Sequence, residues 1–167
     1  RRSFRSGAMS APFPSANALS PSSGRFIEGV HHFPVRIYFE DTDAGGIVYH
    51  ANYLRYMERA RSDMLRLLGI DQRASIETGE GVYAVTRVEI EYRAPAKLDD
   101  DLIVVSRMER VSGATVTIAQ QVMRGEVLLT EAAVTVAFIT PEGRPKRQPR
   151  AWVEIYKSIT NGEPVLS

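Results

Sequence analysis

The sequence predicts one α+β domain in which a long helix packs against an antiparallel sheet. The first observation is the element order, which runs strand, long helix, four strand-like runs and short helix. The second is that the links between the four runs are short, so we expect these runs to form an antiparallel meander. The third is size, because 167 residues with 44% hydrophobic composition can form one core.

The first predicted strand covers residues 33–41. Within it Val35, Ile37 and Phe39 alternate with Arg, Tyr and Glu, which is the period of a half-buried strand. The next residues, 42–46, include two adjacent glycines and indicate a tight loop, because glycine adopts backbone angles closed to other residues.

A long helix is predicted from Asn52, a plausible N-cap, to a stop signal at Gly69. Charged residues lie largely on its other faces, and the apolar positions recur at helical spacing: Tyr53, Met57, Ala60, Met64 and Leu67 or Leu68.

Four strand-like runs follow a polar connection, at residues 83–92, 102–111, 115–123 and 127–139. Their links contain turn-forming residues, namely Pro95, Ser112-Gly113 and Gly125-Glu126. A short helix is predicted after Pro149, with one apolar stripe formed by Trp152, Ile155, Tyr156 and Ile159.

The predicted domain spans residues 33–160, between an N-terminal extension at 1–32 and a C-terminal tail at 161–167. The first 30 residues are rich in Ser, Pro, Gly and Ala and contain a single acidic residue. Three interpretations of them stay open: an expression remnant ahead of Met9, a flexible native extension, or an organelle transit peptide.

Charge and composition exclude several function classes. Four of the 21 basic residues but one of the 20 acidic residues lie in the first 30, which leaves 17 basic and 19 acidic residues in the body. This balance argues against a nucleic-acid-binding domain, which needs a clustered basic surface. No apolar run approaches the roughly 18 residues of a membrane-spanning helix, so we expect a soluble protein without stable membrane insertion. The absence of cysteine excludes disulfides and thiolate chemistry and permits a reducing, cytoplasmic location.

The densest polar cluster, residues 40–43, lies just before the glycine loop and the predicted long helix. A carboxylate beside a helix start suits acyl chemistry, because free N–H groups of the first turn can polarise a carbonyl while the carboxylate attacks it or activates water. The alternative is that Asp41 or Asp43 only caps the turn through its side chain.

Metal and phosphate-ester sites fit this cluster less well. A calcium loop would need an oxygen ligand at Gly45 and a bidentate Glu at Asn52. Phosphatases with an aspartyl nucleophile need repeated strand–helix units, whereas this chain has four successive strands. The three histidines lack zinc-ligand spacing. We therefore expect no metal.

Outside the cluster, most candidates have a plainer interpretation. Glu58 is expected to be a solvated partner of Arg61 or Arg55. His31 and His32 are expected on the surface. Basic loop residues are usually solvated, but they could also bind a phosphorylated ligand: Arg110, Arg144, Lys146, Arg147 and Arg150.

The run of residues 38–53, continued by 56–61, strongly resembles the YbgC-type acyl-CoA thioesterases. This Tol-Pal-associated group belongs to the 4-hydroxybenzoyl-CoA thioesterase branch of the hotdog-fold superfamily. The similarity covers about residues 34–157, and its D-x-D-x-x-G-x-V-x-x-x-N-Y pattern is more specific than the short motifs above. The resemblance implies a hotdog fold, with a curved antiparallel sheet wrapped around a long helix, and hydrolysis of acyl-CoA to a free acid and CoA.

By position, the resemblance places the family's catalytic aspartate at Asp43, as nucleophile or general base. It places the helix-start amide that polarises the carbonyl at His50, with Gly46 and Asn52 supporting the site. A histidine is usual at this position in YbgC-type proteins and is considered catalytic. Some relatives have a proposed catalytic tyrosine where this chain has Phe39, so a phenol cannot act at that position here.

The resemblance also implies a substrate pocket and an assembly. The acyl chain is expected to bind at a subunit interface lined by Val82, Tyr83 and Ala84. CoA phosphates would meet basic loop residues, for which the candidates are Arg110, Arg144, Lys146 and Arg147. The protein is expected to form a homodimer that pairs into a homotetramer. CoA is part of the substrate, so no cofactor is expected.

Two competing functions stay open. The first is a hotdog-fold dehydratase or hydratase, which uses a histidine and an acid on acyl carriers but lacks this aspartate–glycine–helix pattern. The second is a non-catalytic acyl-binding, envelope-associated scaffold with a decayed site. Intact Asp43, Gly46, His50 and Asn52 argue against decay.

Overall fold

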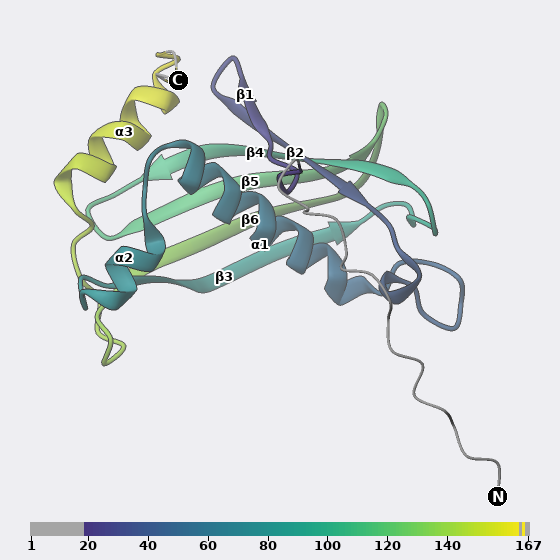
Figure 1. The fold of residues 1–167 in the computed structure, drawn as a ribbon, viewed down its shortest axis with the longest axis horizontal. Coiled ribbons are helices and arrows are strands. Elements are labelled where there is room, and N and C mark those ends of the chain that lie inside the picture. Colours follow the sequence, from purple (N-terminus) through teal and green to yellow (C-terminus); the bar gives the residue numbers. More distant parts are fainter. Residues whose placement is uncertain (1–18, 164, 166–167) are drawn as a thin grey trace, which may run out of the picture.

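The computed structural model describes residues 19–163 and 165, and in it a six-stranded antiparallel sheet packs against the long helix α1 (Figure 1). The strands are β1 (Arg25–Ile27), β2 (Val30–Arg36), β3 (Val82–Tyr92), β4 (Asp101–Val111), β5 (Thr115–Arg124) and β6 (Val127–Ile139). The helices are α1 (His50–Leu67), α2 (Gln72–Glu77) and α3 (Arg150–Thr160), with a 3₁₀ turn at Phe39–Asp41. The predicted α+β class is confirmed, as is the layered arrangement that the family resemblance implies.

The strand order is β1-β2-β4-β5-β6-β3. β4, β5 and β6 form a meander as predicted, but β3 pairs with β6, and β2 takes the place beside β4. The predicted four-strand meander is therefore wrong in its first link. Residues 93–100 carry the chain from β3, at one edge of the sheet, to β4 beside β2 instead of forming a hairpin. On this path the Ala96 carbonyl accepts the Val48 N–H, and Asp99 and Asp100 bond to the backbone of Ile37.

The predicted first strand is too long at its C-terminal end. Val35 and Ile37 are buried as predicted, but the side chain of Phe39 is 81% exposed. The carboxylate of Asp41 accepts the backbone N–H of Tyr38 at 2.8 Å. The Asp41 N–H donates back to the Tyr38 carbonyl at 3.0 Å and closes a 3₁₀ turn, which the carboxylate contact caps, so the extended backbone ends here.

The sheet begins within residues 25–32, which are predicted to belong to the N-terminal extension. Here β1 and β2 form a hairpin, and Phe26 packs against the core. The predicted surface position of His31 is wrong, because its side chain is 0% exposed. Its Nε2 lies 2.9 Å from a carboxylate oxygen of Asp63 on α1, and this pairing allows a polar ring to be buried. The interpretations of the residues ahead of Met9 fall outside the described residues.

The main core lies between α1 and the sheet. The helix begins at His50, two residues before the predicted Asn52, and it ends next to Gly69, whose φ of +74° confirms the predicted stop signal. The buried side chains of α1 include Tyr53, Tyr56, Met57, Ala60 and Met64. Tyr156 and Ile159 of α3 are also buried, as the apolar stripe predicts. Among the described helices, none is long and apolar enough to cross a membrane.

Candidate active site

The loop between β2 and α1 folds back on itself as a narrow hairpin. The Asp43 N–H donates to the Ile47 carbonyl at 2.9 Å, and Thr42 pairs with Val48 as an antiparallel bridge. The Gly46 N–H donates to the Asp43 carbonyl at 3.0 Å. Gly46 has a φ of +77°, which favours glycine at this position. The hairpin therefore places Asp43 at its tip and leads the chain directly into α1.

The side chain of Asp43 is exposed. One carboxylate oxygen accepts the Gly45 N–H at 2.8 Å, which is the turn-capping contact that the sequence allows as an alternative. Among the described residues, none donates a hydrogen bond to the other oxygen. Capping and chemistry are therefore compatible, because one oxygen orients the exposed side chain and the other is free of partners among the described residues.

Asp41 has a different environment, because it is buried between the loop and α1. Its carbonyl accepts the Tyr49 N–H and the side-chain amide of Asn52, each at 2.9 Å. Asn52 thus ties the loop to the helix from inside the first turn, instead of acting as the predicted N-cap. Burial, and next the nearby Asp41 carboxylate, raise the pKa of Tyr56 above its ordinary value. Asp41 and Asn52 are supports of this loop.

The first turn of α1 has N–H groups without partners. Among the described residues, no hydrogen-bond acceptor is found for the N–H of His50 or of Ala51, and the N-cap residue Tyr49 gives no side-chain cap. First-turn N–H groups point out of the helix end, where they coincide with the positive end of the helix dipole. This end of α1 can therefore stabilise negative charge on a bound group.

The side chain of His50 is exposed and lies among aromatic rings. Its ring centroid is 4.5 Å from that of Tyr49 and 6.2 Å from that of Tyr92, both edge-on. The Tyr92 hydroxyl also donates to the His50 carbonyl at 3.0 Å. Sequence reasoning missed Tyr92, because it lies 42 residues from His50 and is joined to it only by the fold.

The link after β3 also supports the helix start. The Val48 N–H donates to the Ala96 carbonyl at 2.9 Å, and the Ala96 N–H donates to the Tyr53 hydroxyl at 3.0 Å. These two bonds lie on either side of the His50 backbone in sequence. The site loop, the first turn of α1 and the end of β3 therefore form one hydrogen-bonded unit.

The predicted acyl-binding residues lie elsewhere in the chain. Val82, Tyr83 and Ala84 begin β3, whereas Tyr92 beside His50 ends it, so they are about 30 Å away along the strand. Tyr83 shares a hydrogen bond of 3.0 Å with the hydroxyl of Tyr156. Burial raises the pKa of Tyr83 to about 12. Tyr83 also lines a cavity of about 50 Å³ between β3, α1 and α3. Within one chain, the structure does not bring these residues to Asp43.

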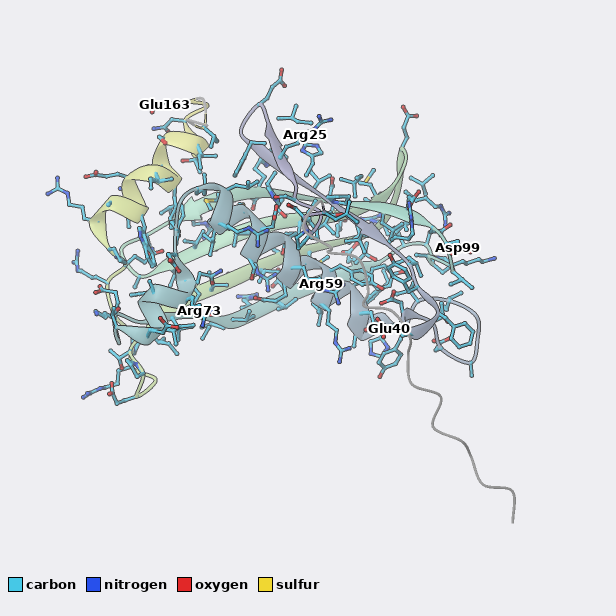
Figure 2. All side chains as sticks on the ribbon, viewed as in Figure 1. Arg25, Glu40, Arg59, Arg73, Asp99 and Glu163 are labelled. Carbon is cyan, nitrogen blue, oxygen red and sulfur yellow. The ribbon has the colours of Figure 1, made fainter. Side chains whose placement is uncertain are left out.

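The basic candidates gather at that same distant end. The Gln148 N–H donates to the Gly113 carbonyl at 2.8 Å, which lays the loop after β6 along the β4–β5 turn. This contact groups Arg110, at the end of β4, with Arg144, Lys146 and Arg147 of the loop. Figure 2 shows the two ends, with Glu40 of the site loop at one and Arg73 of α2 at the other.

Two further predictions concern ion pairs and metals. Glu58 pairs with Arg61 as predicted. The guanidinium of Arg61 is buried and donates to the Gln120 side chain at 2.7 Å. Within the described part of the chain, no group of three or more His, Asp or Glu side chains could hold a metal ion.

Comparison with known proteins gives consistent similarities. Residues 45–131, which include the start of α1, match the family model of the Thioesterase superfamily. The chain is 46% identical over 107 residues to an acyl-CoA thioesterase YbgC of Haemophilus influenzae, covering 64% of this chain and 79% of that protein. It is 39% identical over 127 residues to an acyl-CoA thioester hydrolase YbgC of Escherichia coli O6:H1, covering 75% of this chain and 94% of that protein. The crystal structure of a probable thioesterase from Bartonella henselae aligns with a TM-score of 0.68 and 37% identity, over 72% of this chain and 99% of that one.

Proposed function

Because the chain belongs to the thioesterase superfamily, and within it to the YbgC-type acyl-CoA thioesterases, we propose that its site loop and helix start hydrolyse acyl-CoA to a free acid and CoA. The enzyme class, thioester hydrolase, follows from the family. The assignment of steps to residues is our proposal. The observation that carries it is the exposed Asp43 carboxylate, with one oxygen free of described partners, in the hairpin that leads to the unpartnered N–H groups of α1.

In the general-base route, Asp43 takes a proton from water while the water oxygen attacks the thioester carbonyl. The His50 N–H then donates to the oxyanion that forms on the carbonyl oxygen. When the carbonyl re-forms, the carbon–sulfur bond breaks and the leaving thiolate takes a proton, so the products are the free acid and the CoA thiol. Asn52 and Gly46 hold the loop and helix in place for these steps.

In the nucleophilic route, Asp43 itself attacks the carbonyl, the thiolate leaves, and water hydrolyses the resulting mixed anhydride. A single turnover in ¹⁸O-labelled water can reveal the nucleophilic route. If water attacks the aspartyl carbon of the anhydride, the first acid molecule carries unlabelled protein oxygen. The general-base route and attack of water on the acyl carbon of the anhydride both place solvent oxygen in every acid molecule, so an unlabelled first acid molecule is the decisive result.

The experiment that tests the function is a thiol-release screen with short, long and aromatic acyl-CoAs, run on wild-type protein and Asp43→Asn. We expect release by the wild type and loss of nearly all turnover in the variant, because the amide keeps the shape of the side chain but can act neither as base nor as nucleophile. Asp43→Asn turnover within about threefold of the wild type, under 1 kcal/mol of barrier, would reject the residue assignment. A dehydratase would change the acyl group without releasing thiol, and a scaffold would bind acyl-CoA without turnover.

In a symmetric dimer formed through β3, the candidate site at the end of β3 in one chain would meet the start of β3 in the other chain. β3 is an edge strand that carries exposed Val85 and Val88, and beside it a groove of about 520 Å³ runs along α1. Antiparallel pairing of two β3 strands about a twofold axis at mid-strand sets the start of one against the end of the other. The partner's Val82, Tyr83 and Ala84 would then approach Tyr92 and His50.

The same pairing would carry the partner's basic loops toward the site, where they could meet the CoA phosphates. The four candidates Arg110, Arg144, Lys146 and Arg147 therefore stay predictions for a partner-derived subsite. The pairing of dimers into a homotetramer, a cytoplasmic location and a link to the Tol-Pal system also stay predictions, which depend on the family resemblance.

A further inference from the structure

We propose that Tyr92 is a positioning residue for thioester hydrolysis, which acts by holding the first carbonyl of α1. The inference rests on the proposed function of the helix start. Tyr92 is the last residue of β3, and its hydroxyl donates to the carbonyl of His50, the first residue of α1, at 3.0 Å. Its ring packs edge-on against the ring of Tyr53 at 5.6 Å and that of His50 at 6.2 Å. Both the ring and the hydroxyl of this side chain thus contact the first turn of the helix.

The His50 carbonyl does not need this bond to be satisfied. The carbonyl of a first helical residue accepts an N–H from the fourth residue after it, so the hydroxyl adds a second donor to an oxygen that can accept two. The side chain of Tyr92 is 47% exposed in a single chain, so loss of its hydroxyl there leaves the His50 carbonyl with its helix partner and with access to water. The contact therefore contributes little to folding and more to the orientation of this one peptide group.

Orientation matters here because helix ends fray, and an oxyanion donor must be correctly aimed before the reaction begins. The Tyr92 hydroxyl fixes the plane of the peptide between His50 and Ala51, whose N–H belongs to Ala51, and through the Cα of His50 it restrains the direction of the preceding His50 N–H. The site loop holds the helix start from the other side, through Asp41 and Asn52. Tyr92, which is distant in sequence at the end of β3, provides a second support for the helix start.

Tyr53 offers a matched control, because its ring packs on that of Tyr92 but its hydroxyl has a different task. The Tyr53 hydroxyl accepts the buried Ala96 N–H at 3.0 Å, so Tyr53→Phe leaves a buried donor without a partner and should lower the melting temperature. Tyr92→Phe leaves no buried group without a partner. It should keep the melting temperature of the wild type.

The test measures kcat, KM and melting temperature for wild type, Tyr92→Phe and Tyr53→Phe by thiol release from acyl-CoA. Because small misplacements of catalytic groups cost up to about 100-fold in rate, we expect Tyr92→Phe to lower kcat by roughly tenfold. We expect its KM to stay within about twofold, since the bond orients a group that acts in the transition state. A kcat for Tyr92→Phe within twofold of the wild type would overturn the proposal, as would a loss explained by a raised KM alone.

A second measurement shows whether Tyr92 acts through the helix start. His50→Pro removes the His50 N–H, the donor whose direction Tyr92 is proposed to restrain through the next peptide, so adding Tyr92→Phe to His50→Pro should cause no further loss of kcat. Losses that multiply would mean that Tyr92 acts elsewhere and would overturn the proposal. Asp43→Asn in the same series distinguishes failure of the proposed function from failure of the proposed role of Tyr92. If Asp43→Asn stays active, the proposed function fails, whereas an inactive Asp43→Asn with an unchanged Tyr92→Phe rejects only the role of Tyr92.

Discussion

Asp41 and Asp43 stand in one loop, yet their surroundings differ so much that the same substitution should have two outcomes. Asp41→Asn weakens the buried acceptor of the Tyr38 N–H. Because losing a hydrogen bond to a buried charged group costs about 1 to 3 kcal/mol, we expect this variant to lower the melting temperature, while turnover falls far less than in Asp43→Asn. Circular dichroism melting and thiol release on the same samples measure both quantities. Equal loss of turnover in the two variants, with no change in melting temperature, would contradict this division of roles.

His50 combines a backbone N–H and an imidazole ring, and two substitutions separate them. His50→Ala deletes the ring but keeps the N–H, so we expect measurable hydrolysis to remain. His50→Pro removes the donor, and because one oxyanion donor contributes about 2.7 to 4 kcal/mol, turnover should fall by roughly 100-fold to 1000-fold. Proline is tolerated in a first helical turn, and circular dichroism can verify the fold. If alanine were as inactive as Asp43→Asn and proline no worse than alanine, the ring would be the catalytic group.

The local part of the candidate site could be predicted from the sequence. Asp43, Gly46, His50 and Asn52 lie within ten residues, so the turn chemistry and the helix start place them in one hairpin and the helical turn that follows it. Tyr92 could not be predicted in the same way, because only the packing of β3 under the helix start brings its hydroxyl to His50. The sequence around an aromatic residue at the end of a strand does not indicate which residue of another element it will contact.

The hairpin of β1 and β2 and the residues just before it are anchored to α1 by one buried carboxylate. The Asp63 carboxylate accepts hydrogen bonds from the Ser23 hydroxyl at 3.0 Å and from the Gly24 N–H at 2.8 Å. It also lies 2.9 Å from the Nε2 of His31. A side chain at Gly24 would have no room, because its Cβ would lie 2.4 Å from the His32 carbonyl oxygen. Residues 23 and 24 therefore belong to the folded structure, although their composition resembles that of the polar extension.

The same anchor predicts how stability depends on pH. Burial lowers the pKa of His31 below its ordinary 6.5, although Asp63 acts to raise it. Burial acts to raise the pKa of Asp63, but the Gly24 N–H, His31 and Ser23 together lower it below 3.8. The unfolded chain thus binds a proton at residue 31 more readily than the folded chain, so stability falls as pH drops below about 6.5.

The contribution of Asp63 to stability is lost only at more acid pH, below the ordinary pKa of its carboxyl group. We therefore expect the free energy of unfolding in urea to decrease between pH 7.5 and pH 5, and His31→Gln to flatten this dependence whatever its own stability. An unchanged slope in His31→Gln would show that other groups cause the pH dependence.

The hydrophobic period of the sequence predicts the helices and strands, but it does not predict which strands pair with each other. The helical spacing from Tyr53 to Met64 and the alternation in β4 to β6 specify which side chains face the core, and these elements lie close to their predicted ranges. Period does not specify strand pairing, so the place of β3 beside β6 could not be read from the length of its link to β4. For the same reason the pattern through Phe39 predicts a strand where a side-chain contact from Asp41 ends it.

At the scale of the whole molecule, one chain separates its proposed site from its predicted substrate-binding residues by the length of the sheet (Figure 1). Asp43 and His50 lie at the start of α1, and Tyr83 with the basic loop lies near its far end. The resemblance to a family whose pockets form between subunits agrees with this separation. The proposed dimer through β3 would turn the distance within one chain into proximity between two.

The edge of β3 therefore provides the last prediction, which concerns assembly and activity together. Unpaired edge strands with apolar side chains favour pairing with another chain, and a charge on the edge opposes it. We expect Val85→Lys, on β3, to break the dimer and lower thiol release, because the partner's β3 no longer completes the pocket.

Val127→Lys is the matched control. Val127 has an exposed fraction of 49% against 47% for Val85 but lies at the β5–β6 turn, so this variant should keep the mass and activity of the wild type. Light scattering gives the mass, and a wild-type protein of 18.6 kDa at micromolar concentration would exclude the dimer. A monomeric Val85→Lys with full activity would show instead that one chain holds a complete site.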